Sequence, residues 1–593
     1  MERENITIKV CMGTGGLAAG GEAVMTAFEE NLKSAQLDAS VSRHCSMHKV
    51  GCRGFCARDV LVDIIAGTDK TTYEYIKPDM VPRIVEEHLV GGTPVKEWAV
   101  KDAYHTFHEK QVKVVLADCG EVDPEDIDSY IARDGYTAVR KVLTSMDPEQ
   151  VINTLEASGL RGRGGAGFPT GLKWDFARKA PGTEKYIICN ADEGDPGAFM
   201  DRSVIEGNPH SVIEGMIIAA YSIGASKGYV YIRAEYPLAV ERLRKALSDA
   251  RGRGFIGEGI LKTDFSFDIK IKLGAGAFVC GEETALIASI EGQRGMPRAK
   301  PPFPARKGLW GKPTVINNVE TLANISCIIR NGALWFARFG TDKSKGTKVF
   351  ALTGKVNNTG LIEVPMGISL KEIIYDIGGG IENGRVLKAV QTGGPSGGCI
   401  PADMIDISVD YESLAKVGSI VGSGGMVVMD EMDCMVNIAT YFLEFTQSES
   451  CGKCVPCRIG TKRLLEILTR ITEGRGRPGD IELLETLSRD VKTASLCGLG
   501  QTAPNPVLST IRYFREEYEA HIHEKRCPAG VCKHLLTYSI LEEFCKGCTM
   551  CARVCPAGAI LGEKKQPHRI VQEICIKCGA CFETCKFKAI KKG

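Results

Sequence analysis

Hydrophobic and polar positions change their spacing along the chain, and each change marks a candidate domain. Near the start, apolar alternation predicts a strand at 5–11, and helical spacing predicts a helix around Glu22–Leu32. Short apolar runs predict two further strands, around Ala39–His44 and around Val60–Ile65. We therefore predict a small domain, built from one sheet and its helices, over residues 1–110.

The middle and the second half of the chain follow other patterns. Helical stretches alternate with short apolar strands over 111–345, which is typical of an α/β domain. Short strands and one helix around Leu370–Ile377 predict a small β-rich domain over 346–430. Amphipathic helical patterns dominate 431–535, and two similar short units fill 536–593. The chain is thus predicted to be a multidomain protein with α/β and α+β regions.

Composition and charge exclude several broad classes. The 593 residues include 74 basic and 73 acidic side chains, so a formal net charge of +1 gives no reason to expect a nucleic-acid partner. The chain has no run of about 18 apolar residues, so we expect no membrane span. The start, MERENITIKV, lacks the apolar core of a signal peptide, and we expect a cytoplasmic protein.

The unusual feature of the composition is its 24 cysteines. Disulfides are rare in a reducing compartment, so clustered cysteines there more often bind metals or redox groups than form bridges. Fourteen of the cysteines follow residue 450 in tight, repeated spacings, and four lie within the first 56 residues. The sequence therefore predicts metal or redox centres near both ends of the chain.

The last domain carries the most specific cysteine pattern. Two successive runs follow the spacing C-x2-C-x2-C-x3-C, and the first is followed by Pro556. In two-cluster ferredoxins, which this domain resembles, the fourth cysteine of each run ligates the other cluster. The spacing predicts one [4Fe–4S] cluster on Cys545, Cys548, Cys551 and Cys585, and a second on Cys575, Cys578, Cys581 and Cys555. Structural zinc is the alternative.

A third group of cysteines lies in the helical region. Cys451, Cys454 and Cys457 are separated by gaps of two residues. Cys497, beside glycines in ASLCGLG, is the best candidate for a fourth ligand, because backbone N–H groups can approach the sulfides there. We predict a third [4Fe–4S] cluster on these four cysteines, with zinc as the alternative.

The first domain offers a smaller set of cysteines. Cys52 and Cys56 form a C-x3-C pair, and Cys11 ends the first predicted strand. Together with the strand order, this resembles the thioredoxin-like [2Fe–2S] ferredoxins. That group usually has a cysteine where this chain has Gly16, and Cys45 is the remaining cysteine of the domain. The expected ligands are Cys11, Cys45, Cys52 and Cys56; the alternative is a domain that has lost its cluster.

A glycine-rich loop opens the α/β domain. The run GLRGRGGAGFPTGLKW covers residues 159–174, and its glycines let backbone N–H groups approach a phosphate without a Cβ in the way. A helix that begins nearby would add its positive end, and Lys173 could pair with a phosphate or a ring carbonyl. For the loop taken alone, a tight structural turn is the alternative.

Polar side chains follow the apolar strands of the same domain. The segments NADEGDPG, GEET and TVINNVET each lie at the end of such a strand or just after one. Because strand-end loops of an α/β sheet converge on one crevice, we expect these carboxylates and amides to lie together there. They could bind ribose hydroxyls and the edge of a flavin.

These motifs resemble those of a known family. Residues 150–500 resemble the NADH-binding flavoprotein subunit of respiratory complex I and its soluble relatives, and the glycine-rich run is highly specific to that family. The whole chain is similar to the beta subunit of bacterial electron-bifurcating hydrogenases and to flavoprotein subunits of NAD(P)-linked formate dehydrogenases and transhydrogenases. The resemblance implies a Rossmann-like FMN/NAD domain, a β-grasp-like (ubiquitin-like, SLBB) insert and a helical bundle that holds an iron–sulfur cluster.

The resemblance also implies roles for individual residues. Contacts with FMN are implied for Gly162, Gly164, Gly165, Gly167, Lys173, Asn190, Asp192, Asn317, Asn318 and Thr321. Contacts with the nicotinamide nucleotide are implied for Phe168, Phe176, Glu193, Glu283, Lys300 and Phe303, and the cofactor-binding set also includes Asp195 and Glu282. Asp195 departs from the complex I pattern, which usually has glutamate, and this leaves the choice between NAD and NADP open.

A candidate zinc site lies between the helical region and the ferredoxin-like tail. Cys527 and Cys532, with His521 and Cys434, could form a tetrahedral site, and a metal staple at a domain junction is physically sensible. The alternative is two ordinary junction thiols and solvated histidines.

The combined prediction is an enzyme subunit with no catalytic residue beyond its flavin site. Hydride transfer moves two electrons, each iron–sulfur centre moves one, and a flavin converts between them. We predict FMN, NAD(P)(H), one [2Fe–2S] cluster, three [4Fe–4S] clusters and zinc. The expected partners are a hydrogenase- or formate dehydrogenase-type chain, a small [2Fe–2S] thioredoxin-like subunit and ferredoxin, which would allow electron bifurcation. The alternative is a non-catalytic electron-transfer or scaffold subunit.

Overall fold

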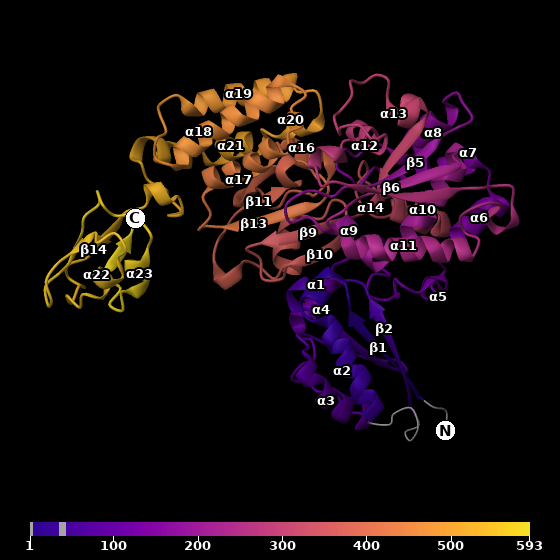
Figure 1. Ribbon diagram of the computed structural model, residues 1–593, viewed down its shortest axis with the longest axis horizontal. Coiled ribbons are helices and arrows are strands. Elements are labelled where there is room, and N and C mark those ends of the chain that lie inside the picture. The colour runs from indigo at the N-terminus through magenta and orange to yellow at the C-terminus, as the bar shows by residue number, and fades with distance from the viewer. Residues whose placement is uncertain (1–3, 35–42) are drawn as a thin grey trace. The chain divides into compact units, whose positions relative to one another are not determined.

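The computed structural model describes residues 4–34 and 43–593 and divides into two compact units (Figure 1). The first unit comprises 1–385 with 390–428, and the second comprises 386–389 with 429–593. Among the described residues, no helix is both long enough and apolar enough to cross a membrane.

The amino-terminal domain of the first unit is a four-stranded sheet with helices. Its strand order is β2-β1-β3-β4; β1 and β2 run parallel, and β3 runs antiparallel to β1 and β4. The strands are β1 Glu4–Cys11, β2 Arg43–Val50, β3 Val62–Ala66 and β4 Asp69–Tyr73. The helices are α1 Thr14–Ala18, α2 Gly21–Ser34, α3 Val81–Ile84, the π-helical η3 Val85–Val90 and α4 Asp102–Glu109.

Most of the elements predicted for this domain are present, with two differences. The second strand lies later than predicted, because β2 overlaps the predicted range 39–44 only at its last two residues; residues 39–42 lie outside the described part. The sequence pattern also misses β4, DKTTY, which pairs only with β3 at the edge of the sheet. Only its last two residues are buried, so its apolar signal is weak.

The α/β domain contains a parallel sheet in the order β7-β6-β5-β8. Its strands are β5 Tyr186–Ala191, β6 Lys227–Arg233, β7 Asp268–Gly274 and β8 Thr314–Asn318. The chain moves from β5 through β6 to β7 on one side and then returns to place β8 on the other side of β5. The strand order therefore reverses between β5 and β8, and ligands of open α/β sheets bind at such a switch point.

Helices surround this sheet. They are α5 Ile127–Ile131, α6 Thr137–Ser145, α7 Pro148–Ser158, α8 Thr170–Lys179, α9 Met200–Gly207, α10 Pro209–Ile223, α11 Pro237–Gly252, α12 Glu283–Ile290, α13 Pro304–Lys307, α14 Val319–Asn331 and α15 Ala333–Ala337. Helix α10 is apolar on nearly every face and is buried almost throughout, as expected for a central helix.

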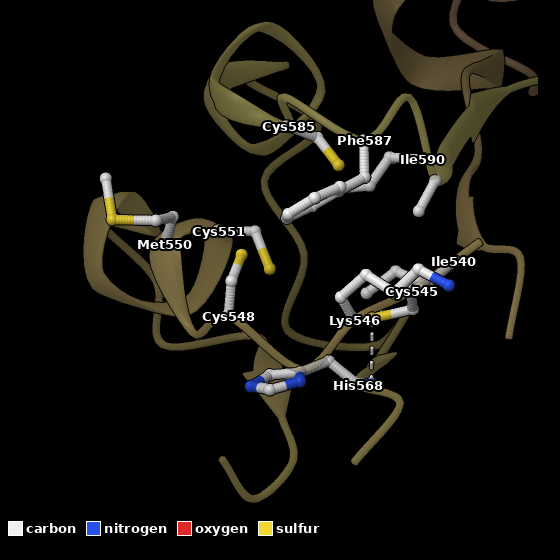
Figure 2. Close-up of a pocket in the computed structure, with 11 residues that line it drawn as sticks. Ile540, Cys545, Lys546, Cys548, Met550, Cys551, His568, Cys585, Phe587 and Ile590 are labelled. Carbon is white, nitrogen blue, oxygen red and sulfur yellow. Dashed lines mark hydrogen bonds between the residues drawn. The ribbon is translucent and has the colours of Figure 1, made fainter. Parts of the chain in front are cut away.

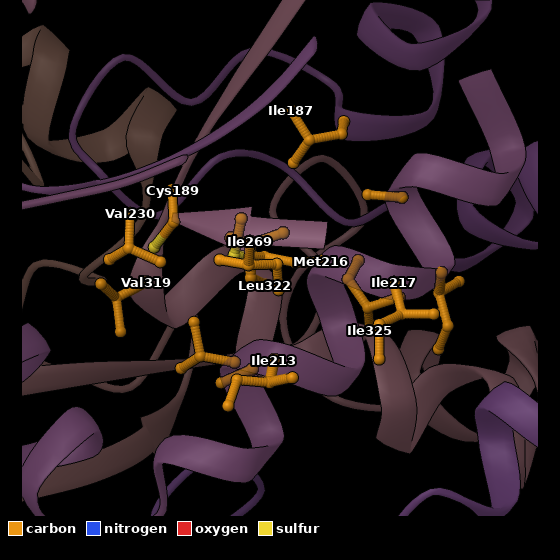
Figure 3. Packing of buried hydrophobic residues seen from close by; sticks show 14 of the residues in the cluster. Ile187, Cys189, Ile213, Met216, Ile217, Val230, Ile269, Val319, Leu322 and Ile325 are labelled. Carbon is orange, nitrogen blue, oxygen red and sulfur yellow. The ribbon is translucent and has the colours of Figure 1, made fainter. Parts of the chain in front are cut away.

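The core of the α/β domain packs sheet residues against α10 and α14. Cys189 and Val230 from the sheet belong to the same buried cluster as Met216 and Leu322 from the two helices (Figure 3). Gly215 permits close approach of the helices, because a Cβ at this position would lie 2.1 Å from the carbonyl oxygen of Leu322. This core fixes the ends of β5 and β8, where the candidate site lies.

The β-rich insert forms a five-stranded sheet in the order β10-β9-β13-β11-β12. The strands are β9 Thr347–Gly354, β10 Gly360–Pro365, β11 Leu387–Thr392, β12 Gly398–Pro401 and β13 Gly425–Asp430. The predicted helix around 370–377 is present as the π-helical turn η7, Glu372–Ile377, and a short helix, α16 Tyr411–Lys416, follows later.

The second unit contains a helical bundle and a small tail. The helical segments of the bundle are α17 Met435–Ser448, the π-helical η11 Pro456–Gly460, α18 Thr461–Thr472, α19 Asp480–Ala494, α20 Gly498–Thr502, α21 Asn505–Glu519 and the π-helical η12 Ala520–Glu524. The tail consists of β14 Tyr538–Ile540, α22 Met550–Val554, β15 Ile560–Leu561, β16 Arg569–Ile570, α23 Ala580–Thr584 and β17 Ile590–Lys592. Strand β14 pairs with β17 and β15 with β16, which reflects the repeat in the sequence.

Candidate functional site

The glycine-rich loop joins α7 to α8 and forms a cradle. The N–H of Gly162 donates to the carbonyl oxygen of Phe168 at 2.8 Å, which closes the loop. Gly165 and Gly167 have φ angles of +118° and +62°, which residues with a side chain rarely adopt. A Cβ on Gly167 would lie 2.7 Å from the ring of Tyr411. The loop therefore needs glycine for its backbone path, as a phosphate cradle does.

Arg163 supports this loop from inside the protein. Its guanidinium is buried and donates to the carbonyl oxygens of Thr347 at 2.9 Å, Arg161 at 3.1 Å and Lys345 at 2.6 Å. Its backbone N–H donates to Oγ1 of Thr321 at 2.8 Å. Because these acceptors are neutral oxygens, the positive charge adds to the attraction of the loop for an anion.

The asparagines predicted for the flavin site lie on adjacent strand ends. Asn190 on β5 is paired in register with Asn318 on β8. The Nδ2 of Asn190 donates to the carbonyl oxygen of Gly281 at 2.9 Å, which ties this strand end to the GEET segment. The indole Nε1 of Trp174 donates to Oδ1 of Asn317 at 2.9 Å, so the amide nitrogen of Asn317 is left to contact a ligand. The structure thus brings the predicted amides to one edge of the sheet.

The lysines and glutamates of the candidate site form two arrangements. Lys173 donates to the carbonyl oxygen of Ile316 at 3.0 Å, and burial lowers its pKa although the charge of Glu283 opposes the shift. Within the described residues Lys173 has no carboxylate partner within 4 Å, so it fits a bound anion or ring carbonyl. Lys300 instead pairs with Glu282 at 2.9 Å and with Glu283 at 2.5 Å. The carboxylate of Glu282 also caps α12.

Two carboxyl groups of the NADEGDPG segment have raised pKa values. Burial raises the pKa of Glu193 to about 7, although this group accepts hydrogen bonds from the N–H groups of Asp201 and Arg202 at 3.1 Å. Burial raises the pKa of Asp195 to about 6, and the hydroxyl of Ser423, which donates to Asp195, limits that shift. Both groups therefore titrate close to neutral pH.

Three aromatic residues predicted for the nucleotide site are exposed. Phe168, Phe176 and Phe303 have exposed fractions of 42%, 49% and 58%. Phe176 lies on α8 and Phe303 precedes α13, and these two helices are neighbours. Exposed aromatic faces suit the stacking of a planar ligand.

The cysteine runs of the tail enclose two cavities. The first cavity is lined by Cys545, Cys548, Cys551 and Cys585 (Figure 2). The second cavity is lined by Cys555, Cys575, Cys578 and Cys581. In each cavity the fourth cysteine comes from the other run, which is the arrangement that the spacing predicts. Apolar residues such as Ile590 in the first cavity and Ile560 in the second complete the lining.

The third predicted cysteine set lies together in the helical bundle. Burial raises the pKa of Cys457 to about 11; a hydrogen bond with Ser450 opposes the shift, and the charges of Cys454, Cys497 and Cys451 add to it. A Cβ on Gly500, three residues after Cys497, would lie 2.9 Å from the Cβ of Cys457, so the segment that carries Cys497 lies against the segment that carries the three other cysteines. Cys497 lies at the start of α20, where backbone N–H groups are not engaged within the helix.

A buried group of four potential metal ligands lies in the second unit. The group comprises Cys434, His521, Cys527 and Cys532, whose ligand atoms all lie within 4.8 Å of one another. Nε2 of His521 is 3.4 Å from the sulfurs of Cys434 and Cys532, and those sulfurs are 3.7 Å apart. A tetrahedral zinc ion with Zn–S bonds of about 2.3 Å requires S···S separations of about 3.8 Å. The Nδ1 of His521 donates to the carbonyl oxygen of Glu517 at 2.6 Å and so orients the ring for this role.

The amino-terminal domain brings together three of its four predicted ligands. The sulfurs of Cys52 and Cys56 are 3.3 Å apart, and Cys11 interacts with Cys52. Cys45, however, lies on β2 five residues before Val50, the residue that pairs with Cys11. Five residues of strand span about 16 Å, so the register of β2 does not bring Cys45 to the other three thiols.

Sequence reasoning missed residues of the insert that contact the glycine-rich loop and the NADEGDPG segment. The hydroxyl of Tyr411 donates to the carbonyl oxygen of Gly162 at 2.8 Å, and Arg161 lies over the Tyr411 ring at 4.1 Å. Ser423 reaches Asp195. Tyr411 and Ser423 come from the insert, and no local signal in the sequence connects them with the loop. Arg163 could have been noticed as a basic residue within the glycine run.

Five family models match the sequence. They are the thioredoxin-like [2Fe-2S] ferredoxin at 2–89, the Nuo51 FMN-binding domain at 155–327, the SLBB domain at 349–400, the NADH-ubiquinone oxidoreductase-F iron-sulfur binding region at 437–521 and the 4Fe-4S dicluster domain at 544–590. With the geometry above, these matches define an oxidoreductase subunit that combines FMN-binding, [2Fe–2S] and [4Fe–4S] domains.

Individual proteins match over most of the chain. The NADP-reducing hydrogenase subunit HndC of Solidesulfovibrio fructosivorans is 61% identical over 487 residues, which is 82% of this chain and 99% of that relative. An NADH-quinone oxidoreductase subunit of Escherichia coli (strain K12) is 42% identical over 68% of this chain and 91% of that relative. An NAD+-reducing [NiFe]-hydrogenase structure in the H2-reduced state aligns with a TM-score of 0.62 at 31% identity, covering 87% of this chain and 84% of that chain. The chain therefore belongs to the family of FMN-binding flavoprotein subunits of complex I and related hydrogenases.

Proposed function

We propose that this chain exchanges hydride between NAD(P)(H) and FMN and passes single electrons through iron–sulfur clusters to a partner subunit. The partner that the named relatives favour is a hydrogenase, because HndC and the aligned solved structure are both described as hydrogenase proteins. A formate dehydrogenase-type chain, a small [2Fe–2S] thioredoxin-like subunit and ferredoxin are further candidate partners, and with ferredoxin the complex is suited to electron bifurcation.

One observation carries this proposal. At the switch point between β5 and β8, a loop that requires glycine lies beside paired asparagines and a lysine that no carboxylate neutralises. This combination of backbone cradle, amides and half-buried cation fits a phosphate and a heteroaromatic ring with carbonyl groups. The donor chemistry therefore suits FMN better than a structural turn.

The side chains of this site have separate tasks. When bound, FMN accepts two electrons together from a nicotinamide and releases them one at a time. The glycine loop, with Arg163 behind it, holds the phosphate. Asn190 and the amide nitrogen of Asn317 orient the ring, and Lys173 donates to an oxygen of the same ligand. Phe168 and Phe303 cover the nicotinamide nucleotide and exclude water from it.

The cysteine sets supply the one-electron centres. We assign a [4Fe–4S] cluster to the set Cys451, Cys454, Cys457 and Cys497, one such cluster to each cavity of the tail, and a [2Fe–2S] cluster to the amino-terminal domain. We assign zinc to the set Cys434, His521, Cys527 and Cys532. The distances in that set suit tetrahedral zinc, and its complete burial suits a structural role.

The experiment that tests this function uses the full chain loaded with FMN, iron and sulfide under anaerobic conditions. We expect NADH or NADPH to reduce a viologen dye, and we expect removal of FMN to abolish the activity. The variant Lys173→Met should lower turnover about 10- to 100-fold, the loss expected for a hydrogen bond from a charged donor. The matched control Lys179→Met changes an exposed lysine of the same helix and should leave turnover unchanged.

A chain that keeps FMN and its clusters but reduces no dye with either nucleotide would contradict the proposal. It would instead favour a non-catalytic electron-transfer role. The identity of the partner is tested separately, by affinity purification from the source cells followed by identification of the co-purifying chains; we expect a hydrogenase.

A further inference from the structure

We infer that the carboxylate of Asp59 is the fourth ligand of the [2Fe–2S] cluster in the amino-terminal domain, together with Cys11, Cys52 and Cys56. This inference rests on the cluster proposed above for that domain. It goes further by identifying the group that takes the place of the missing cysteine.

The three thiols and the carboxylate border one small space. Cys11 ends β1, Cys52 and Cys56 lie in the loop that follows β2, and Asp59 comes directly after the short turn that begins at Cys56. The sulfurs of Cys52 and Cys56 are 3.3 Å apart, and the N–H of Cys11 donates to the carbonyl oxygen of Leu61, two residues after Asp59, at 3.0 Å. The end of β1 that carries Cys11 therefore lies beside the segment that carries Asp59.

Two adjacent glycines, Gly15 and Gly16, lie against the carboxylate of Asp59 and the thiol of Cys11, respectively. A Cβ on Gly16 would lie 3.2 Å from the sulfur of Cys11, and a Cβ on Gly15 would lie 2.8 Å from Oδ2 of Asp59. The thiol and the carboxylate thus pack against neighbouring residues of one turn. Gly13 borders the same space, since its Cβ would lie 3.1 Å from the Cβ of Cys52.

The position of the missing cysteine leaves no room for a thiol. Gly16 stands where related ferredoxins carry their second cysteine, and a Cβ there would lie 2.2 Å from the carbonyl oxygen of Cys11. A contact this short requires the backbone to move. The loop is therefore shaped around three thiols, and its fourth ligand must come from another direction.

The carboxylate of Asp59 has no other task in the described part of the chain. Both of its oxygens are shielded from solvent and have no hydrogen bond of good geometry among the described residues. Burial raises the pKa of Asp59 to about 6, and only the thiol of Cys11, the charge of Arg53 and the N–H of Leu61 oppose the shift. An enclosed carboxylate with such weak contacts is costly, and ligation to iron would satisfy it. The nearby Asp63 is not a competitor, because it pairs with Arg53 and with Lys70.

The remaining cysteines are poor candidates. Cys45 lies about 16 Å along the strand from the level of Cys11. Cys119 packs against Gly207 of α9, where its sulfur would lie 2.9 Å from a Cβ. Burial raises the pKa of Cys119 to about 12, and the charged groups that further shift it are Asp118, Lys113 and Glu363 rather than the thiols of the amino-terminal domain.

A carboxylate ligand has a recognisable spectroscopic effect. It carries the same single negative charge as a thiolate, but its oxygen is a harder ligand than sulfur. One iron of the cluster would therefore have mixed oxygen and sulfur ligation, and the two irons would differ more than in an all-cysteine cluster. This difference can be measured without an activity assay.

The test uses the full chain and its variants. EPR spectra of the reduced protein are recorded at temperatures where [4Fe–4S] signals have relaxed away, and Mössbauer spectra are recorded on the same samples. We expect Asp59→Cys to keep the [2Fe–2S] signal with shifted g values and with more similar iron sites. We expect Asp59→Ala to lose the signal and about two irons per chain. The controls Cys45→Ser and Cys119→Ser should give the spectra of the unchanged protein.

The outcomes separate this inference from the proposal on which it rests. If Asp59→Cys and Asp59→Ala both retain the original spectrum, Asp59 is not a ligand and the inference is overturned. A lost or altered signal in either control would also overturn it, because a cysteine would then be the fourth ligand. If the unchanged protein holds its [4Fe–4S] clusters but shows no [2Fe–2S] signal at all, the proposed cluster itself fails.

Discussion

The tail and the amino-terminal domain build their cysteine sites in different ways. In the tail, both cavities take all their cysteines from two short runs, each of which spans one helical turn and its flanks. In the amino-terminal domain, Cys11 reaches Cys52 from a strand about forty residues earlier, and Asp59 completes the space. A site made from one short run can be read from spacing, whereas a site assembled from distant segments depends on the fold.

The largest expected effect is the loss of a whole cluster from the tail, where single cysteine variants test directly whether each site is read from spacing. Cys585→Ser and Cys555→Ser should each remove one [4Fe–4S] cluster, or about four irons per chain, because each cysteine lines the cavity of the other run. The double variant Cys545→Ser with Cys585→Ser should also lose only one cluster, because both cysteines line the same cavity. Iron analysis and EPR measure the number of clusters. Cys327→Ser, outside all candidate sites, is the control. Loss of two clusters from the Cys585→Ser and Cys545→Ser pair would show that the assignment across the runs is wrong.

The proposed zinc site is assembled from distant segments, like the proposed site in the amino-terminal domain. His521→Ala should remove about one zinc per chain and lower the Tm of the second unit by about 6–12 °C, as expected for a loss of roughly 3 kcal/mol. Metal analysis and thermal unfolding measure the two effects. His523→Ala changes an exposed histidine two residues away and should alter neither value. A zinc content that is unaffected by His521→Ala would remove this site from the account.

A buried ion pair joins the α/β domain to the insert. Removing it measures how much this contact, which lies away from the candidate flavin site, contributes to the stability of the first unit. Nζ of Lys348 lies 2.5 Å from Oε2 of Glu320, and both side chains are almost completely buried. Lys348→Met leaves the carboxylate without its partner and should destabilise the first unit by about 3–5 kcal/mol. The loss is measured by denaturant-induced release of FMN. Lys355→Met, at an exposed position, is the control; equal stability of the two variants would contradict the expected cost.

The smallest effect is a pH dependence at Asp195. Because its pKa is raised to about 6, this group is neutral below that pH and becomes anionic as the pH rises through it. The anion should repel the 2′-phosphate of NADPH, so the KM for NADPH relative to NADH should increase about 5-fold between pH 5.5 and 7.5, or about 1 kcal/mol. Asp195→Asn should make the ratio of the two KM values independent of pH. Steady-state kinetics at several pH values measure this ratio. An unchanged slope in the variant would place Asp195 outside the nucleotide site.

The sequence indicated most directly the cysteines that are close together in the chain, whereas Cys497 and the group of Cys434 and His521 were chosen from the few remaining ligand residues and needed the fold to bring them together. The tail cavities and the set around Cys451 follow from spacing, because a short turn brings such cysteines together whatever surrounds them. Cys45 is seven residues from Cys52 in sequence, which suggested a shared site, whereas the extended strand β2 carries it away from the other thiols. Tyr411 and Ser423 could not be assigned either, since only the folded insert brings them to the glycine loop.

Anaerobic titration of the full chain with NADH or NADPH tests the central claim most directly. Flavin absorbance and EPR of the reduced clusters are followed together, in samples with and without FMN. The account predicts cluster reduction only when FMN is bound, with about two electrons delivered per nucleotide. Equal cluster reduction without FMN, or a chain that takes up iron and sulfide but never FMN, would contradict it.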